Sequence, residues 1–308
     1  MLKQIAWNLR CRLRQALGNA PPGEAPLTGA EAAEGVYRDY VQYGGLTPDR
    51  LANRRILDAG SGTGAAVSLR LVAAGAGAVV SLDRFASGRR PSEACAVYGS
   101  LRQRLSADEQ SRFDAAVDLS GGVRFNPERL RVIEASHFEE GLRGLEPESF
   151  SVVVSHARLA EVRASDRAFQ LLDRALERGG LMLHKIDLGD RGTFTRYGMH
   201  PLEFLTVPEI VYRMMSDRSG LPNRHRIDYY RAKMRELGYF AGLLVTAVAG
   251  EPGELVPYQP ALEPGTDYSE GSLALVRKIR PRLARRFRHL PDADLLITGL
   301  FLVARKPE

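Results

Sequence analysis

Arg55-Ile56-Leu57-Asp58-Ala59-Gly60-Ser61-Gly62-Thr63-Gly64 is the stretch of sequence that decides the fold. Its short apolar run ends in an acid, glycines follow at every second position, and an alanine-rich segment with leucines at helical spacing comes next. This order predicts a strand, a tight turn that lets the backbone approach a ligand, and a helix whose free N–H groups point at that ligand.

A second acid lies where a nucleotide site would need one. The apolar run at 78–82 predicts another strand, and Asp83 follows it, nineteen residues after Gly64. A carboxylate at the tip of the second strand can accept hydrogen bonds from both hydroxyls of a ribose. The two segments together predict that an adenosine-like molecule binds here.

Two classes of ligand fit the glycine loop. Gly60-x-Gly62-x-x-Ala65 matches the fingerprint of nicotinamide dinucleotide sites, with Asp83 near the expected offset. Gly60-x-Gly62-x-Gly64 is instead the spacing of S-adenosylmethionine (AdoMet) sites, and we favour this ligand. A glycine turn without any ligand would explain the loop, but not the ordered strand, helix and acid around it.

Length, composition and cysteine content limit the class of protein. The chain has 308 residues, 44% of them apolar, as in globular proteins of one large or two small domains. It has no apolar run of bilayer length, no secretory signal at its start, and only Cys11 and Cys95 as cysteines. These features predict a cytoplasmic protein without a disulfide framework or a zinc site.

Two segments hold most of the excess positive charge. The net charge is +6, and residues 1–17 and 277–289 carry basic residues without an acid. Residues 1–17 predict an amphipathic helix that either packs on its own domain or makes a peripheral contact with the inner face of a membrane. Residues 277–289 predict a basic helix, which is either a solvated face or a contact for an anionic partner.

The other apolar patterns predict a doubly wound α/β fold. Strand candidates at 131–134, 150–155 and 181–186 alternate with helices. Two late candidates, 239–248 and 295–303, are separated by a surface excursion, which suggests an antiparallel pair at one sheet edge. A dinucleotide fold would continue with parallel units instead. We expect a mostly parallel seven-stranded sheet with an antiparallel C-terminal strand, helices on both faces, and helical cap insertions.

Helical segments outside this pattern divide the chain. We expect an N-terminal helical extension over 1–49 and one large domain over 50–308. Within that domain we expect an insertion at 84–130 and a cap at 190–226 at the mouth of the ligand crevice.

The helix expected to start at Thr28 carries three tyrosines, Tyr37, Tyr40 and Tyr43. A helix that precedes the first strand often covers the nucleotide site in such folds. The tyrosines are therefore expected either to line that site or, for most of them, to pack in the core.

With these features the chain resembles the class I AdoMet-dependent methyltransferases from about residue 50 to 306. The resemblance is carried by 56–64, by Ile133-Glu134-Ala135, and by 151–162 and 175–183. It implies a methyltransferase with AdoMet as its cofactor. Residues 184–190 and 294–306 resemble a bacterial subgroup associated with polysaccharides and natural products, which implies O-methylation of a sugar, a glycan or a secondary metabolite.

Carried over residue by residue, the resemblance implies a cofactor site at the carboxyl ends of the strands. The implied residues are Asp58, Gly60, Ser61, Gly62, Gly64, Asp83, Glu134, Ala135 and Ser155. The sequence departs from the family at Glu134, where the shorter Asp or Asn is usual, and in the length of the insertion at 84–130.

Methyl transfer from a sulfonium is an in-line displacement, so alignment of the acceptor and exclusion of water supply much of the rate. A hydroxyl acceptor must also lose a proton, and a neighbouring base helps. The catalytic candidates are His156, His184 and Asp187, with His200 as a further one. Alternation places His184 and Asp187 on opposite faces of their strand. Each of these residues also has a purely structural interpretation.

Other ligands have weaker support in the sequence. Asp187 and Asp190 could hold Mg²⁺ with a nearby histidine, but such a pair in a polar loop is usually a turn, so we predict no metal. The Asn/Asp-Pro-Pro-aromatic stretch of nucleobase amine methylation does not occur at 155–158. We expect a small-molecule or glycan acceptor, anionic or lipid-linked, rather than a nucleic acid. An RNA or protein methyltransferase, an NAD-type oxidoreductase and a silent AdoMet binder are the alternatives.

Overall fold

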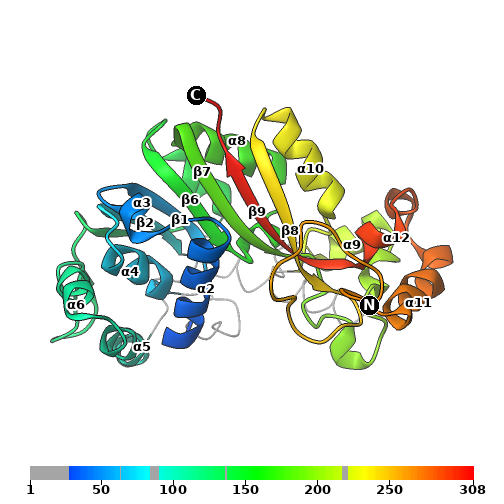
Figure 1. Cartoon of the computed structure of the whole chain (residues 1–308), viewed down its shortest axis with the longest axis horizontal. Coiled ribbons are helices and arrows are strands. Elements are labelled where there is room, and N and C mark those ends of the chain that lie inside the picture. Colours follow the sequence, from blue (N-terminus) through cyan, green and yellow to red (C-terminus); the bar gives the residue numbers. More distant parts are fainter. Residues whose placement is uncertain (1–27, 63, 84–89, 136, 217–220) are drawn as a thin grey trace.

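The computed structural model describes residues 28–62, 64–83, 90–135, 137–216 and 221–308. A central twisted sheet runs through the molecule with helices packed around it (Figure 1). None of the helices in these described ranges is long and apolar enough to cross a membrane. Residues 1–17, for which the sequence predicts an amphipathic helix, lie outside the described residues.

The main sheet has seven strands in the order β5-β2-β1-β6-β7-β9-β8. The first five are parallel: β5 (Leu130–Glu134), β2 (Ala78–Asp83), β1 (Arg55–Ser61), β6 (Phe150–His156) and β7 (Leu176–Asp187). β8 (Phe240–Val248) is the far edge, and β9 (Ile297–Arg305) lies antiparallel between β7 and β8. The predicted mostly parallel seven-stranded sheet with an antiparallel C-terminal strand is confirmed.

Side chains of the central strands alternate between two cores, because successive residues of a strand point to opposite faces. In β7, Leu181 and Leu183 belong to one core, and Met182 and Ile186 to the other. The first core lies under α2 (Ala30–Gln42), α4 (Ala66–Ala73), α5 (Pro91–Gln103) and α6 (Ala107–Asp114). The second lies under α7 (Phe138–Arg143), α8 (Ser165–Ala175) and α10 (Ile227–Glu236).

A buried arginine ties the helices of the first core together. Arg70 of α4 pairs with Glu34 of α2 at 2.7 Å and with Glu109 of α6 at 3.0 Å. Its guanidinium also lies 4.0 Å from the centre of the Tyr37 ring. The described part of segment 84–130 contains α5, α6 and the small β3–β4 hairpin (Val117–Asp118 and Arg124–Phe125). Both helices of this part pack against α4.

Two helix boundaries differ from the sequence-based expectation. α2 begins at Ala30 rather than at Thr28, and Gly29 is its N-cap residue. The pattern over 166–177, followed by Gly179 and Gly180, predicts a helix that these glycines end; instead, α8 ends at Ala175, and Gly179, with a φ of 69°, lies inside β7. The division of the chain at residue 50 stays a prediction.

The expectation of one basic helix over 277–289 was wrong. α11 (Glu270–Ile279) ends just before Pro281, and two short 3-10 turns follow, Arg280–Arg282 and Arg285–Phe287. The proline has no N–H for a helical hydrogen bond, and its ring clashes with the preceding turn. The arginines therefore lie on irregular backbone that curves back on itself.

Segment 190–226 starts with a turn built on a buried acid. The Asp190 carboxylate accepts hydrogen bonds from the backbone N–H groups of Gly192, Phe194 and Thr195 at 2.9, 2.7 and 2.8 Å. Short 3-10 turns and α9 (Glu209–Ser216) follow. Asp190 thus forms the turn that the sequence allowed as the alternative to a metal ligand.

A second buried arginine fixes the place where β7 and β9 meet. Arg226, 1% exposed, donates from Nη1 to the carbonyl of Leu188 at 2.6 Å. Its Nη2 donates to the carbonyls of Leu295, at 2.9 Å, and Ile297. One guanidinium therefore donates hydrogen bonds to three backbone carbonyls in a buried region, where an acceptor without a donor is costly.

We expect Arg226→Met to lower the free energy of unfolding by about 3 kcal/mol or more, because each buried carbonyl that loses its donor costs roughly 1–3 kcal/mol. Urea unfolding followed by circular dichroism measures the change. Arg231→Met is the matched control. Arg231 lies on α10, the helix that Arg226 precedes, is 45% exposed and pairs with Asp294. Its loss should stay below about 1 kcal/mol. Equal losses in the two variants would contradict the role given to Arg226.

Candidate active site

The glycine loop follows β1, and its backbone adopts conformations that favour glycine. Gly60, Gly62 and Gly64 have φ values of 96°, 115° and 88°, which side chains with a Cβ rarely allow. The buried carboxylate of Asp58 anchors the loop, since it accepts hydrogen bonds from the Gly60 N–H at 3.2 Å and the Ser68 hydroxyl at 2.6 Å. Asp58 is thus in place to hold the shape of the loop.

Three side chains from other segments surround this loop. A Cβ added to Gly60 would lie 3.0 Å from Cγ of Arg158, and one added to Gly62 would clash with the hydroxyl of Thr28. The hydroxyl of Tyr98, on α5, accepts a hydrogen bond from the backbone N–H of Ala65 at 3.0 Å. No local pattern in segment 84–130 indicated that it would supply a residue here.

The two acids predicted to contact a nucleoside lie side by side. Asp83 ends β2 and Glu134 ends β5, and these residues are direct partners in the parallel pairing of the two strands. The backbone N–H of Ala135 donates to the Asp83 carbonyl at 3.0 Å. Asp83 is 7% exposed, whereas Glu134 is exposed. The strand ends therefore place one recessed and one open carboxylate next to the glycine loop.

The same row of strand ends continues toward β7. Ser61 of β1 pairs with His156 of β6, and His156 pairs with Lys185 of β7. Burial, with the nearby charge of Lys185, lowers the pKa of His156 to about 4, so its imidazole is neutral at pH 7. Ala157 follows with a φ of 62°, an unusual value for a residue with a side chain, and turns the chain away behind His156.

Ser155, predicted as a cofactor contact, and His184, predicted as a catalytic residue, lie inside the protein. Both are fully buried, and the Ser155 hydroxyl lies 2.7 Å from Nδ1 of His184. The His184 ring contacts the edge of Phe169, on α8, with ring centres 6.3 Å apart. Because alternate residues of β7 face opposite sides, His184 faces α8 while Lys185 and Asp187 face the other way.

Asp187 ends β7, two residues beyond Lys185, whereas His200 lies outside the sheet. The Asp187 side chain is 43% exposed and accepts a hydrogen bond from the Gly189 N–H at 2.8 Å. Partial burial of this carboxyl group raises its pKa. The two ring nitrogens of His200 lie within hydrogen-bond distance of the Leu275 carbonyl and the Leu202 N–H. No cluster of three His, Cys, Asp or Glu side chains suited to a metal occurs in the described parts of the chain.

A pocket of about 650 Å³ opens beside His156 and Lys185. One wall is the face of α2, and another is the loop that follows β8. The lining residues are Thr28, Gly29, Ala32, Gly35, Val36, Arg38, Asp39, Gln42, Tyr43, His156, Lys185, Glu254, Val256 and Tyr258. None of the described residues of 190–226, the expected cap, lines this pocket, whereas the loop after β8 does.

A hydrogen-bonded network crosses the floor of this pocket. The Lys185 ammonium lies 2.8 Å from carboxylate oxygens of both Asp39 and Glu254, and donates to the Tyr258 hydroxyl at 2.6 Å. The Tyr258 hydroxyl in turn lies 2.9 Å from each carboxylate. Lys185 thereby joins β7 to α2 and to the loop after β8.

Aromatic packing supports the same wall. The rings of Tyr43 and Tyr258 are stacked with centres 3.9 Å apart, and the Tyr258 N–H donates to the Tyr43 hydroxyl at 3.2 Å. Burial and the hydrogen bond with Asp39 raise the pKa of Tyr258, so this phenol stays protonated. Tyr43, which follows the last residue of α2, lines the pocket, whereas Tyr37 and Tyr40 of α2 are packed in the core.

Comparisons with known proteins give likenesses only at the level of three-dimensional structure. No protein-family model matches the chain, and no curated protein matches it in sequence. The chain is similar to an S-adenosylmethionine-dependent methyltransferase from Mesorhizobium loti, with 16% identity, 87% of this chain and 97% of that chain covered, and a TM-score of 0.40.

Two further solved structures are similar to a comparable degree. The first is a SAM-dependent methyltransferase from Archaeoglobus fulgidus, with 11% identity, 89% and 94% of the two chains covered, and a TM-score of 0.43. The second is phosphoethanolamine N-methyltransferase 2 from Haemonchus contortus in complex with S-adenosyl-L-methionine, with 15% identity, 93% of this chain and 55% of that chain covered, and a TM-score of 0.44. Likenesses this distant carry no argument about the ligand or the reaction of this chain.

Burial of His184 makes the stability of the protein depend on pH. Burial lowers its pKa from 6.5 to about 3, so above pH 6.5 the residue is neutral in both folded and unfolded chains. As the pH falls toward 3, the unfolded chain takes up the proton first, and stability is lost. Relative to His184→Gln, wild type should lose on the order of 1 kcal/mol of unfolding free energy per pH unit between pH 6 and 4.

Urea unfolding at a series of pH values measures this difference. His156 and His225, whose pKa values burial also lowers to about 4, are present in both proteins and cancel in the comparison. Parallel pH profiles for wild type and His184→Gln would show that His184 does not titrate in this way.

Proposed function

We propose that this protein is an AdoMet-dependent methyltransferase whose cofactor lies on the glycine loop 60–64. The observation that carries the proposal is the row of strand ends, in which this loop stands beside Asp83 and Glu134 on one side and the lined pocket at His156 on the other. A cofactor on the loop would have its ribose near Asp83, its adenine near Glu134, and its methyl group facing the pocket.

The topology of the sheet supports a methyl donor over a dinucleotide. A dinucleotide-binding sheet continues with further parallel βαβ units beyond its switch point. Here the strand after β7 in the sheet is the antiparallel β9, which reaches that place only at the end of the chain. The second half of a dinucleotide site, which those parallel units would build, therefore has no counterpart in this arrangement.

The proposed acceptor is the hydroxyl of a sugar, a glycan or a secondary metabolite. A pocket of 650 Å³ is within the usual range for small-molecule sites. Its walls combine aromatic faces with carboxylate, ammonium, guanidinium and amide groups, which suits a ring that carries several hydroxyls. Arg38 and Lys185 balance Asp39 and Glu254, so the pocket has no strong preference for a charged acceptor.

Within this proposal His156 takes up the proton of the reacting hydroxyl. Its neutral imidazole lines the pocket and lies in the strand row next to the glycine loop, where acceptor and methyl donor would meet. Lys185, Asp39 and Tyr258 then position the acceptor through their hydrogen-bonded network. Much of the rate would come from alignment of the acceptor and exclusion of water by α2 and the loop after β8.

We expect Asp83→Ala to weaken AdoMet binding by about tenfold to several hundredfold, because hydrogen bonds to a charged group contribute roughly 1.5–3 kcal/mol each. Isothermal titration with AdoMet, S-adenosylhomocysteine and NAD measures the affinities. Asp108→Ala is the control, since Asp108 is an exposed acid on α6 outside the loop. Binding of NAD without any response to AdoMet would overturn the proposal.

We expect His156→Gln to lower kcat by roughly 10²- to 10⁴-fold, as for removal of a general base, while AdoMet affinity stays unchanged. Formation of S-adenosylhomocysteine against a panel of sugars, nucleotide-linked sugars and phenolic metabolites measures turnover and identifies the acceptor. A wild-type protein that binds AdoMet but turns over no acceptor in any class would indicate a silent binder. Equal turnover by wild type and His156→Gln would remove the base role from His156.

A further inference from the structure

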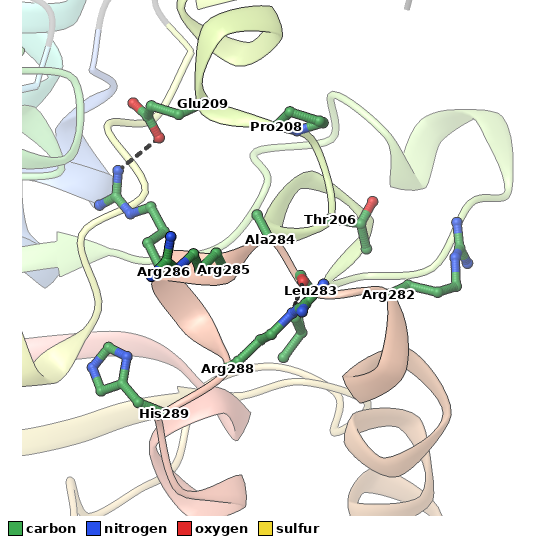
Figure 2. A pocket seen from close by; sticks show the side chains of 10 residues that line it. All are labelled: Thr206, Pro208, Glu209, Arg282, Leu283, Ala284, Arg285, Arg286, Arg288 and His289. Carbon is green, nitrogen blue, oxygen red and sulfur yellow. Dashed lines mark hydrogen bonds and ion pairs between the residues drawn. The ribbon is translucent and has the colours of Figure 1, made fainter.

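A second cavity, of about 1030 Å³, lies between the start of α9 and the basic turns that follow α11. Figure 2 shows its lining side chains, with arginines around an apolar floor. The lining residues are Thr206, Pro208, Glu209, Arg282, Leu283, Ala284, Arg285, Arg286, Arg288 and His289. It shares none of them with the pocket at His156, and we refer to it as the arginine pocket.

Positive charge in the arginine pocket exceeds negative charge. One carboxylate, Glu209, lines it and pairs with Arg286 at 2.9 Å (Figure 2). The same carboxylate also pairs with the buried Arg224 at 2.6 Å. Arg282 pairs with Glu203, which does not line the pocket. Within the described residues, neither Arg285 nor Arg288 pairs with an acid, and the Arg285 guanidinium makes no hydrogen bond.

Glu209 does not cancel this surplus. Burial alone would raise its pKa, but the hydrogen bond from Arg286 and the charge of Arg224 lower the pKa below its ordinary value. The carboxylate therefore stays ionised at neutral pH and is occupied by two cations. The Arg288 guanidinium donates from Nε to the Leu283 carbonyl at 2.9 Å, so its two terminal nitrogens and the Arg285 guanidinium remain to meet an anion from outside the chain.

The pocket is built on fixed backbone rather than on loose side chains. Arg224, 2% exposed, donates to the carbonyls of Phe204 and Val207 at 3.0 and 2.7 Å, and its guanidinium lies 3.8 Å from the centre of the Tyr212 ring. Across the pocket, the Ala284 N–H donates to the Leu205 carbonyl at 3.0 Å. Both walls are thereby attached to one buried framework, which lowers the entropic cost of binding.

The residue types of the pocket indicate the chemistry of its ligand. Arginine has a planar set of donors that matches phosphate oxygens, and it is used widely for phosphate recognition. Pro208, Leu283 and Ala284 add apolar surface between the arginines. On α9 next to the pocket, Ile210 and Met214 are 77% and 54% exposed, and their spacing of four residues places them on one side of the helix.

We propose that the arginine pocket binds the phosphate group of an amphipathic phosphoester, with Arg285 and Arg288 on the phosphate and the apolar surface against the organic part. The ligand is either a soluble phosphoester or the headgroup of a membrane lipid, which share this chemistry. Binding here needs neither AdoMet nor an acceptor, so the proposal stands or falls independently of the methyltransferase activity.

The test is isothermal titration of the full chain, without AdoMet, with decyl phosphate below the concentration at which it forms micelles. Inorganic phosphate and the neutral decanol serve as probes of the two halves of the ligand. We expect decyl phosphate to bind at least about tenfold more tightly than inorganic phosphate, because the apolar floor adds to the contact of the arginines. Decanol alone should not saturate the site.

Arg285→Gln and Arg288→Gln should each weaken decyl phosphate binding by about tenfold, the effect of one lost charge-assisted hydrogen bond. Arg277→Gln is the matched control, since it removes the same charge from α11, where Arg277 is exposed and pairs with Glu270 outside the pocket. An equal loss in Arg277→Gln would mean that general positive charge attracts the ligand, and would overturn the proposal. So would absence of decyl phosphate binding.

Flotation with vesicles distinguishes the two sources of the phosphoester. Binding to phosphatidylglycerol vesicles but not to phosphatidylcholine vesicles, lost in the Arg285→Gln, Arg288→Gln double variant, would support a lipid headgroup. Decyl phosphate binding without vesicle binding would support a soluble phosphoester. Tighter binding of a single-stranded oligonucleotide than of decyl phosphate, with the same dependence on Arg285 and Arg288, would assign the surface to nucleic acid and overturn the proposal.

Discussion

The backbone hydrogen bonds among β5, β2, β1, β6 and β7 set the positions of the strand ends on which the candidate active site is built. Because these strands are parallel and paired in register, their carboxyl ends form one row along a single edge of the sheet. Glu134, Asp83, Ser61, His156 and Lys185 occupy that row in spatial order. A shift of one residue in a single pairing would turn every side chain of that strand to the opposite face.

Buried cations connect the parts of the molecule that the sheet alone does not hold. Lys185 joins a strand end to α2 and to the loop after β8, and Arg226 joins β7 to β9. Arg224 does the same for the walls of the arginine pocket. In each case one charged group satisfies several acceptors, as a buried charge requires if its desolvation is to be offset. The loops around both pockets are therefore positioned by polar contacts and not only by apolar packing.

Sequence patterns were reliable where a residue's neighbours in the chain decide its structure. Local spacing predicted the turn at the three glycines and the places of the acids at the ends of β2 and β5. It also predicted the seven strands, because continuous apolar runs are typical of strands buried on both faces. The prediction of one basic helix over 277–289 was wrong. It rested on the run of basic residues, whereas Pro281 decides where α11 ends.

By itself, the sequence determined the fold class, the glycine loop and the strand ends that carry Asp83, Glu134 and His156. Only the tertiary structure decided which other residues join them. Asp39, Glu254 and Tyr258 meet Lys185 from sequence distances of 69 to 146 residues, and local spacing carries no information about such contacts. Likewise, the histidine at 184 matched a catalytic pattern, but packing of β7 against α8 buries it away from the crevice.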